Sequence, residues 1–325
     1  MAKSKNRTIK TYITLFEHVV KPVLMYGCEI WGITMKKKDI TEIGSEIWER
    51  FHLRVCKNIL GVHKNTTNMA VLSEMGRYPL SHDIHKQMTK FFLRFEDMAG
   101  TRLAKKAFEE QKNLKNYENW VTATTNFLDN LGLSYIHNQN TREGPLTKTE
   151  INRRSIIVKN RENEIFEQNL MLKIEEKCAT GEGKLLFFGK MKDNFGTEDY
   201  LLTMKSAKLR KKISQLRLSA HKLEMEVGRH KGLKREERIC QYCRMGEIES
   251  EEHFLFECPN YSEERESFRA KLRIIETLNR KNEGIEMIKE ILRSKDETVL
   301  NLFGQFLNKA WETRYLRGSN LPRTV

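Results

Sequence analysis

Apolar residues recur at the spacing of one helix face near the start of this chain. Between residues 9 and 24 they fall at positions 9, 12, 13, 16, 19, 20, 23 and 24, which is the i, i+3, i+4, i+7 repeat of an amphipathic helix. Pro22 interrupts the pattern because proline has no backbone N–H to donate. The repeat returns over residues 39–60, and Gly61 is placed to end that helix. The pattern therefore predicts two packed helices before residue 62.

The rest of the chain continues in the same way. Similar patterns predict helices at residues 69–75, 81–98, 120–131, 152–176, 261–278, 285–292 and 299–315. Aromatic residues on one face of the last helix are typical of a packed core, more than of a surface on which bases stack. Residues 138–148 are polar and contain Gly144 and Pro145, so this segment is the best candidate for an internal linker.

Composition supports a helical protein. The 325 residues are 39% apolar and 31% charged, and only 5 are proline. This balance suits helices with solvated outer faces better than it suits a β-sandwich. A chain of this length can form two compact units or one elongated unit. We expect a mostly α, elongated helical protein.

The cysteines and one histidine form a motif with a specific chemistry. Cys240, Cys243, His253 and Cys258 follow a C-x2-C-x9-H-x4-C spacing. Thiolate and imidazole are ligands that Zn²⁺ prefers, and a two-residue gap lets a tight turn direct two sulfurs at one metal ion. Four protein ligands close the coordination sphere, so the expected Zn²⁺ is structural. The alternative is a coincidence of buried cysteines and a core histidine, but the polar segment between Cys243 and His253 favours a metal-binding loop.

The sequence contains no signal that would direct the protein to a membrane or to secretion. No stretch reaches the roughly 20 uninterrupted apolar residues of a membrane span, and we expect no membrane insertion. Residues 1–7 are basic, but neither an apolar core nor a cleavage site of signal-peptide type follows them. Cys28, Cys56 and Cys178 are isolated, which fits reduced thiols. We expect an intracellular protein, nuclear or cytoplasmic, and not a secreted one.

Charge is distributed unevenly along the chain. The net charge is +14, and residues 205–238 hold twelve Lys or Arg against four Glu. The segment 244–268 reverses this balance, with eight Glu against two Arg. One interpretation is two solvated helix faces. The other is a basic helix over 205–238 that binds phosphates beside the metal site. The candidate nucleic-acid contacts are Lys208, Arg210, Lys211, Lys212, Arg217, Arg229, Lys231, Lys234 and Arg235.

Four stretches carry motifs that occur together in one known family. They are VKPVLMYGCEIWG at 20–32, KNILG and MGRYPL within 51–80, LRLSAH at 216–221 followed by EVGR at 226–229, and RICQYC, ESEEHFL and CPNY around the Cys/His cluster. Together they resemble the carboxy-terminal part of the reverse-transcriptase polyprotein of LINE-like, non-long-terminal-repeat retrotransposons. The resemblance implies a thumb-like and post-thumb helical region at 1–150. It also implies a helical carboxy-terminal region at 151–325 with a small CCHC zinc finger at 238–262.

The catalytic motifs of that family are missing from this sequence. Polymerase chemistry needs carboxylates that hold two Mg²⁺ ions, and the family presents two of them in a Tyr/Phe-x-Asp-Asp box. The chain contains no Asp-Asp pair, nothing that resembles an apurinic-type endonuclease, and no restriction-like nuclease motif after Cys258. We therefore expect a carboxy-terminal remnant that is not an enzyme.

The sequence leaves three functional hypotheses. The first is a zinc-stabilised fragment that binds RNA or DNA, mainly through the phosphate backbone. The second is a transposon-derived relic that folds without a specific binding role. The third, an active polymerase or nuclease subunit, is disfavoured by the missing carboxylates. The sequence does not identify a polymerase or endonuclease partner.

Overall fold

The structure is a computed structural model that describes residues 9–34, 44–114, 119–138, 144–275 and 283–318. Helix accounts for 72% of the described residues. The described residues form no β-sheet, and their only bridges are isolated ones between Met75 and Thr197 and between Ile239 and Ile248. The predicted mostly α fold is therefore confirmed. No helix in the described part of the chain has both the length and the apolar character that a membrane crossing needs.

The chain forms two compact units, and neither of them is a continuous segment. Unit 1 contains residues 1–14, 53–77 and 172–325, and unit 2 contains residues 15–52 and 78–171. The boundary expected near residue 150 is therefore wrong. It fails because α9 (Lys148–Thr180) continues without a break through this position. The candidate linker at 138–148, whose residues 139–143 lie outside the described part, falls within unit 2 and does not separate the units.

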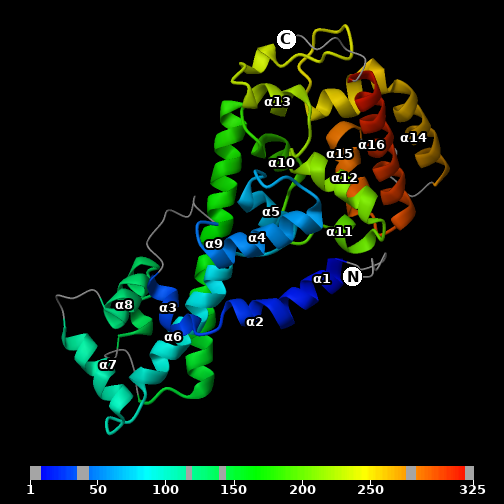
Figure 1. Cartoon of the computed structure of the whole chain (residues 1–325). Helices are drawn as coiled ribbons and strands as arrows, with labels where there is room; N and C mark the ends of the chain where they lie inside the picture. The colour runs from blue at the N-terminus through cyan, green and yellow to red at the C-terminus, as the bar shows by residue number, and fades with distance from the viewer. Residues whose placement is uncertain (1–8, 35–43, 115–118, 139–143, 276–282, 319–325) are drawn as a thin grey trace. The chain divides into compact units, whose positions relative to one another are not determined.

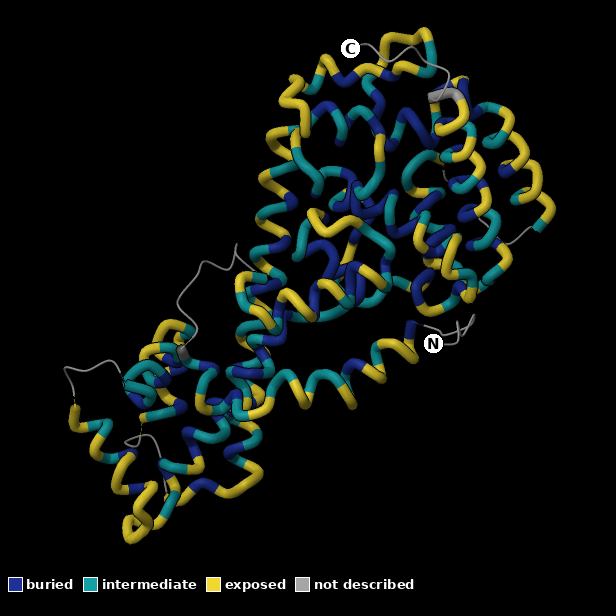
Figure 2. Tube along the Cα trace, in the orientation of Figure 1, coloured by how far each residue is buried: buried dark blue, intermediate teal, exposed yellow. Residues whose placement is uncertain are grey.

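Helices α1 (Ile9–Leu15), α4 (Ile47–Leu60) and α9 contribute residues to both units. The elements that lie wholly in unit 2 are η1 (Phe16–Val20), α2 (Lys21–Leu24), α3 (Cys28–Trp31), η2 (Gly32–Thr34), α6 (Leu80–Glu96), α7 (Leu103–Asn113), α8 (Trp120–Asn130) and η4 (Ser134–Ile136). Buried residues of α6, α7, α8 and η4 form a core that includes Phe92, Phe108 and Leu128, and Figure 2 marks the buried positions of the chain in dark blue.

Pro22 has the local effect that its chemistry predicts. The helix over residues 9–24 contains a π-helical turn, η1, directly before α2, and the Lys21 N–H donates to the carbonyl oxygen of Phe16. Proline at the second position of α2 has no N–H to donate, and its ring would clash with the carbonyl four residues earlier in a regular helix. The wider π turn accommodates the ring without ending the helix.

The elements that lie wholly in unit 1 are α5 (Asn68–Glu74), α10 (Leu185–Met191), α11 (Asp199–Thr203), α12 (Ala207–Arg217), α13 (Glu224–His230), η6 (Arg235–Glu237), η7 (His253–Glu257), η8 (Pro259–Tyr261), α14 (Ser262–Ile274), α15 (Gly284–Arg293) and α16 (Glu297–Gly318). Helix α16 packs against α12, α14 and α15 (Figure 1). Phe303, Phe306 and Leu307 on its apolar face are buried. The aromatic face of this helix is therefore part of the core, as its pattern predicts.

The single basic helix predicted over 205–238 is wrong. The segment forms α12, a turn, α13 and the short η6. Helix α12 ends in a Schellman motif: the Ala220 N–H donates to the Gln215 carbonyl at 2.8 Å, and the Ser219 N–H donates to the Leu216 carbonyl at 3.2 Å. Ser219 has a positive φ of 46°. Glycine is the usual residue there, so the sequence gives no clear signal for this helix end.

Candidate metal centre

Four side chains of unit 1 converge at the position that the Cys/His spacing predicts. The ligand atoms of Cys240, Cys243, His253 and Cys258 all lie within 4.8 Å of one another. The Cys240 and Cys258 sulfurs are 4.0 Å apart, and the Cys243 sulfur is 3.4 Å from Nε2 of His253. Cys240, His253 and Cys258 are buried, and Cys243 is half-buried. This cluster can hold a metal ion.

A short hairpin positions the first two cysteines. The Cys240 N–H donates to the Glu247 carbonyl at 2.8 Å, and the Glu249 N–H donates to the Arg238 carbonyl at 2.9 Å. Between these two bonds the chain reverses direction, with Gly246 at φ 73°, a conformation that favours glycine. The turn directs the sulfurs of Cys240 and Cys243 towards the same point.

The π-helical segment η7 positions the other two ligands. The His253 N–H donates to Oγ of Ser250 at 3.1 Å, which fixes the start of the segment. Five residues later, the Cys258 N–H donates to the His253 carbonyl at 2.8 Å. The wide π turn brings Cys258 back beneath His253, and π turns of this kind are frequent at functional sites. Arg265 holds the end of the segment by donating to the Cys258 carbonyl at 2.8 Å.

The four donors fit a tetrahedral metal. A metal bound by sulfur at about 2.3 Å in tetrahedral geometry has ligand atoms about 3.8 Å apart, close to the 4.0 Å between the Cys240 and Cys258 sulfurs. Nε2 of His253 faces Cys243, and Nδ1 lies 3.4 Å from the Glu257 carboxylate. Nδ1 has no hydrogen-bond partner among the described residues, so the Glu257 carboxylate contributes charge near the ring without orienting it. Four protein ligands leave no position for an activated water, so the site suits a structural ion.

The two closest thiols differ in acidity. The hydrogen bond between Cys240 and Cys258 raises the pKa of Cys240 and lowers the pKa of Cys258, while burial raises the pKa of both. Cys258 is thus the thiol that most readily becomes a thiolate. Metal ions bind thiolates and not thiols, so loading the site releases protons.

Buried ion pairs attach the hairpin to the rest of unit 1. Glu249 is 1% exposed and accepts two hydrogen bonds from Arg314 of α16, at 3.0 and 2.8 Å. It also accepts from the Glu224 N–H at the start of α13, at 2.7 Å. The Arg314 guanidinium lies 4.5 Å from the centre of the Tyr242 ring, which places that ring in a cation–π contact. Tyr242 therefore supports the hairpin.

A second set of contacts involves η7 and the turn after α12. Buried Glu251 accepts hydrogen bonds from Ser219 at 2.8 Å and from His221 at 2.9 Å. Trp311 stacks on Phe254, with ring centroids 4.4 Å apart, and also on His221. His221 is therefore a structural histidine. Phe254 is 0% exposed, so it belongs to the core and is not available to stack on a base.

For two of the nine candidate nucleic-acid contacts the prediction is wrong, because their side chains are buried. Arg210 is 3% exposed and Arg217 is 1% exposed. Arg210 donates to the Met204 carbonyl at 2.7 Å. Neither guanidinium is available to a phosphate. Positions 210, 213 and 217 lie on the same face of α12, and this face packs against the core.

The other seven candidates lie at the surface of unit 1. Lys208, Lys211, Lys231 and Lys234 are exposed. Lys212, Arg229 and Arg235 are half-buried. Two already have acidic partners: Arg229 is 2.9 Å from Glu226, and Lys208 is 3.9 Å from Glu312. Of the other five, Arg235 donates to the Gly181 carbonyl, and exposed Lys211, Lys231 and Lys234 present positive charge to solvent.

The partner of Arg217 could not be recognised from the sequence. Its guanidinium contacts Glu74 of α5 at 2.7 and 3.1 Å and Glu198 at 3.0 Å. Burial opposes the charged form of Arg217, but these two carboxylates hold its pKa above the ordinary value. Tyr200 donates to Glu74 at 2.7 Å. Glu74 and Arg217 are 143 positions apart in the chain, and no local pattern links them.

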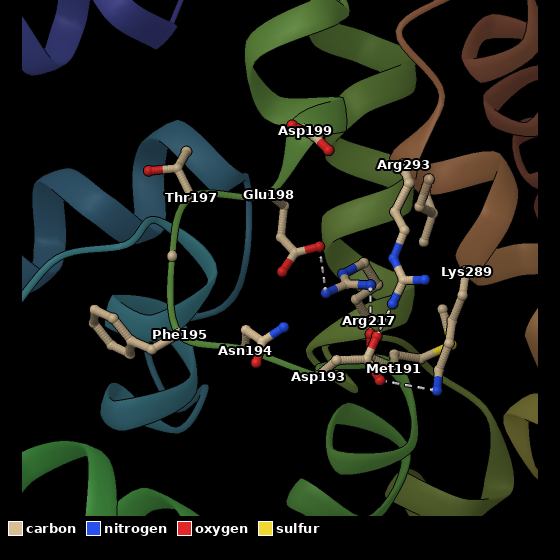
Figure 3. Close-up of a pocket in the computed structure, with 12 residues that line it drawn as sticks. Met191, Asp193, Asn194, Phe195, Thr197, Glu198, Asp199, Arg217, Lys289 and Arg293 are labelled. Carbon is tan, nitrogen blue, oxygen red and sulfur yellow. Dashed lines mark hydrogen bonds and ion pairs between the residues drawn. The ribbon is translucent and has the colours of Figure 1, made fainter.

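A cavity of about 210 Å³ lies beside this network. The 193–199 loop lines one side of it, and Lys289 and Arg293 of α15 line the other (Figure 3). Asp193 accepts from Lys289 at 3.1 Å and also pairs with Arg293. Because acidic and basic groups neutralise each other around the cavity, it selects neither an anion nor a cation.

Comparison of the chain with protein-family models, with curated proteins and with solved structures finds no match.

Proposed function

We propose that this protein binds RNA or DNA through the phosphate backbone and that a structural Zn²⁺ ion holds the binding surface in shape. The observation that carries the proposal is the placement of the basic segment. Seven of its nine candidate residues lie at the surface of unit 1, and the segment leads directly into the metal centre. Phosphate contacts from such residues provide affinity with little sequence choice. The motifs shared with the carboxy-terminal part of LINE-like reverse transcriptases support the same function.

Zinc is the metal that the donor set favours. Three thiolates and one imidazole are a soft to borderline set, which suits Zn²⁺ and disfavours Mg²⁺, Ca²⁺ and Mn²⁺. Zn²⁺ also accepts four-coordinate tetrahedral geometry without a preference imposed by d electrons. A filled coordination sphere assigns the ion a structural role, and we propose no catalytic step for this chain.

The hairpin transmits the effect of the metal to the basic residues. Glu249 follows the metal-bound turn, and its carbonyl accepts from the Met225 N–H in α13 at 3.2 Å. Arg238 precedes the turn and donates to the Leu233 carbonyl at 2.8 Å. A Cβ on Gly228 would lie 2.7 Å from Cγ of Arg238, so α13 packs closely on this side chain. The metal thus fixes the position of α13 and of the loop that carries Lys231 and Lys234.

The test is a comparison of two charge-reversal variants of equal net charge. Lys231→Glu with Lys234→Glu changes the proposed surface, and Lys295→Glu with Lys309→Glu changes exposed lysines elsewhere in unit 1. Binding to a single-stranded RNA and to a DNA duplex of the same length is measured by fluorescence anisotropy over a salt series. We expect the first variant to weaken binding at least about tenfold more than the second. Equal losses would mean that the chain binds only as any basic protein does, as expected of a relic without a binding role.

A further inference from the structure

We propose that the loop between α4 and α5, residues 61–67, completes the nucleic-acid surface, and that exposed Lys64 and half-buried Lys184 form a subsite for one backbone phosphate beside the buried side chain of Lys57. This inference rests on the proposed function. It extends the surface to residues that precede the basic segment by many positions, and it includes none of the nine candidates that the sequence suggests.

The loop contacts two lysines from distant parts of the chain, one in α4 and one directly before α10. Nζ of Lys57, near the end of α4, donates to the Lys64 carbonyl and to Oδ1 of Asn68, each at 2.6 Å. Nζ of Lys184, just before α10, donates to the Asn65 carbonyl at 2.9 Å. All three acceptors are uncharged. The loop therefore holds both ammonium groups in place without neutralising either of them.

No carboxylate forms a salt bridge with Lys57, Lys64 or Lys184 in the described part of the chain. Other lysines of unit 1 do so, as Lys192 does with Glu198 and Lys205 does with Glu297. An ammonium group that is already oriented and lacks an acidic partner can bind an anion without first breaking a salt bridge.

The loop lies against the basic segment. Nε2 of Gln215 in α12 donates to the Gly61 carbonyl at 2.7 Å. A Cβ on Gly61, which has a φ of +68°, would lie 2.5 Å from the side chain of Lys211. Exposed Lys211 therefore crosses the start of the loop. Helices α5, α10, α12 and α13 belong to unit 1, as does the part of α4 from Leu53 onwards (Figure 1).

The electrostatic environment favours an added anion. Burial lowers the pKa of Lys57, and the positive charge of Lys184 lowers it further. Burial also lowers the pKa of Lys184, where Arg229 acts in the same direction and Glu226 acts against it. Positive charges therefore repel one another around Lys184, and Glu226 offsets part of this repulsion. A phosphate between the lysines would compensate this charge, and a phosphodiester backbone supplies phosphates at regular spacing.

The experiment uses the full zinc-loaded chain and two variants that each lose two positive charges. Lys64→Gln with Lys184→Gln removes the subsite, and Lys295→Gln with Lys309→Gln is the control. The slope of log K against log salt concentration is measured with the single-stranded RNA and with the DNA duplex. Circular dichroism of each variant establishes that it is folded.

We expect the subsite variant to lower the magnitude of the slope by about 0.7 to 0.9, the contribution of one phosphate contact, and the control to change it by much less. A larger change with one probe identifies RNA or DNA as the preferred source of the phosphate. If the wild type shows localised binding in the Lys231 and Lys234 test and the subsite variant keeps the control's slope, the subsite is wrong and the proposed function stands. If the wild type does not bind either probe, both are wrong.

Discussion

At the scale of single residues, the basic side chains of α12 have two different roles. Arg217 is buried against Glu74 and Glu198, whereas Lys208 and Lys211 on the same helix are exposed. Both groups contribute equally to net charge, but only the exposed group can contact a polyanion. The sequence shows the charge of a residue, while the helical face on which the residue lies determines how that charge is used.

Loss of the Arg217 side chain is expected to destabilise unit 1. Arg217→Met leaves the Glu74 carboxylate buried at 0% exposure without its cation, and breaking a buried pair in this way costs about 3–5 kcal/mol. The matched control is Lys212→Met, on the same helix but half-buried. Urea unfolding of the three proteins measures the difference. An Arg217→Met midpoint equal to that of the control would show that the ion pair does not stabilise the fold.

Asp83 of unit 2 makes stability depend on pH in the acid range. Burial raises the pKa of this carboxyl, but the hydrogen bonds and charges of Lys159 at 2.5 Å and Lys21 at 2.6 Å outweigh burial and hold the pKa below the ordinary value. A folded pKa below the unfolded one gives stability that is present above the unfolded value, about 3.9. This stability is lost as the pH falls towards the folded pKa.

Asp83→Asn is therefore expected to weaken the protein near neutral pH and to lose part of its acid sensitivity. The expected loss near pH 7 is about 1–2 kcal/mol, since the pair is only partly buried. Melting temperatures of the wild type and the variant between pH 3 and 7 provide the measurement. The two curves should converge at low pH, and a constant separation over the whole range would contradict the assignment.

At the scale of elements, sequence patterns locate most of the helices but not their relations to one another. The patterns at 120–131 and 285–292 correspond to α8 and α15 within one or two residues at each end. The helix end at Ser219 was missed, because its left-handed conformation uses serine in place of glycine. The Cys/His cluster could be predicted because its spacing in the sequence reflects the ligand chemistry of a metal ion. The ion pair between Glu74 and Arg217 could not be predicted from the sequence, because tertiary packing alone brings these residues together.

The contact between α12 and α16 depends on a residue without a side chain. A Cβ on Gly304 would lie 2.8 Å from Cβ of Leu209, and these two positions cannot separate without moving the helices. Gly304→Ala should therefore destabilise the protein, although alanine in a helix gains about 1 kcal/mol over glycine. Gln305→Ala, at an exposed neighbouring position, should be nearly neutral. Thermal melting compares them, and a stabilised Gly304→Ala variant would refute the close approach of these helices.

At the scale of the whole molecule, the metal centre is integrated into unit 1. Its hairpin and its π segment contact α16 through Arg314 and Trp311, and they contact α13 through Glu249. The small finger expected at 238–262 is therefore packed into the larger core of unit 1. Its stability and that of the surrounding helices should be linked.

Metal loss is accordingly expected to affect unit 1 beyond the four ligands. In the Cys243→Ser variant, amides of α13 and α16 should exchange hydrogen faster than in the wild type. Amides of α8 in unit 2 should be unchanged, because that helix has its own core around Leu128. Hydrogen exchange with mass spectrometry resolves these segments. Faster exchange confined to residues 240–258 would show that the centre is energetically separate from the helices.

The most direct test of this account is the zinc content of the purified chain. Protein prepared without chelator is analysed for metals, with Cys243→Ser as the control. We predict about one zinc per wild-type chain and a large loss in the variant, since the four donors form one closed tetrahedral site. Wild-type protein with no zinc, or with the same zinc content as the variant, would contradict the structural metal on which the proposed nucleic-acid surface depends.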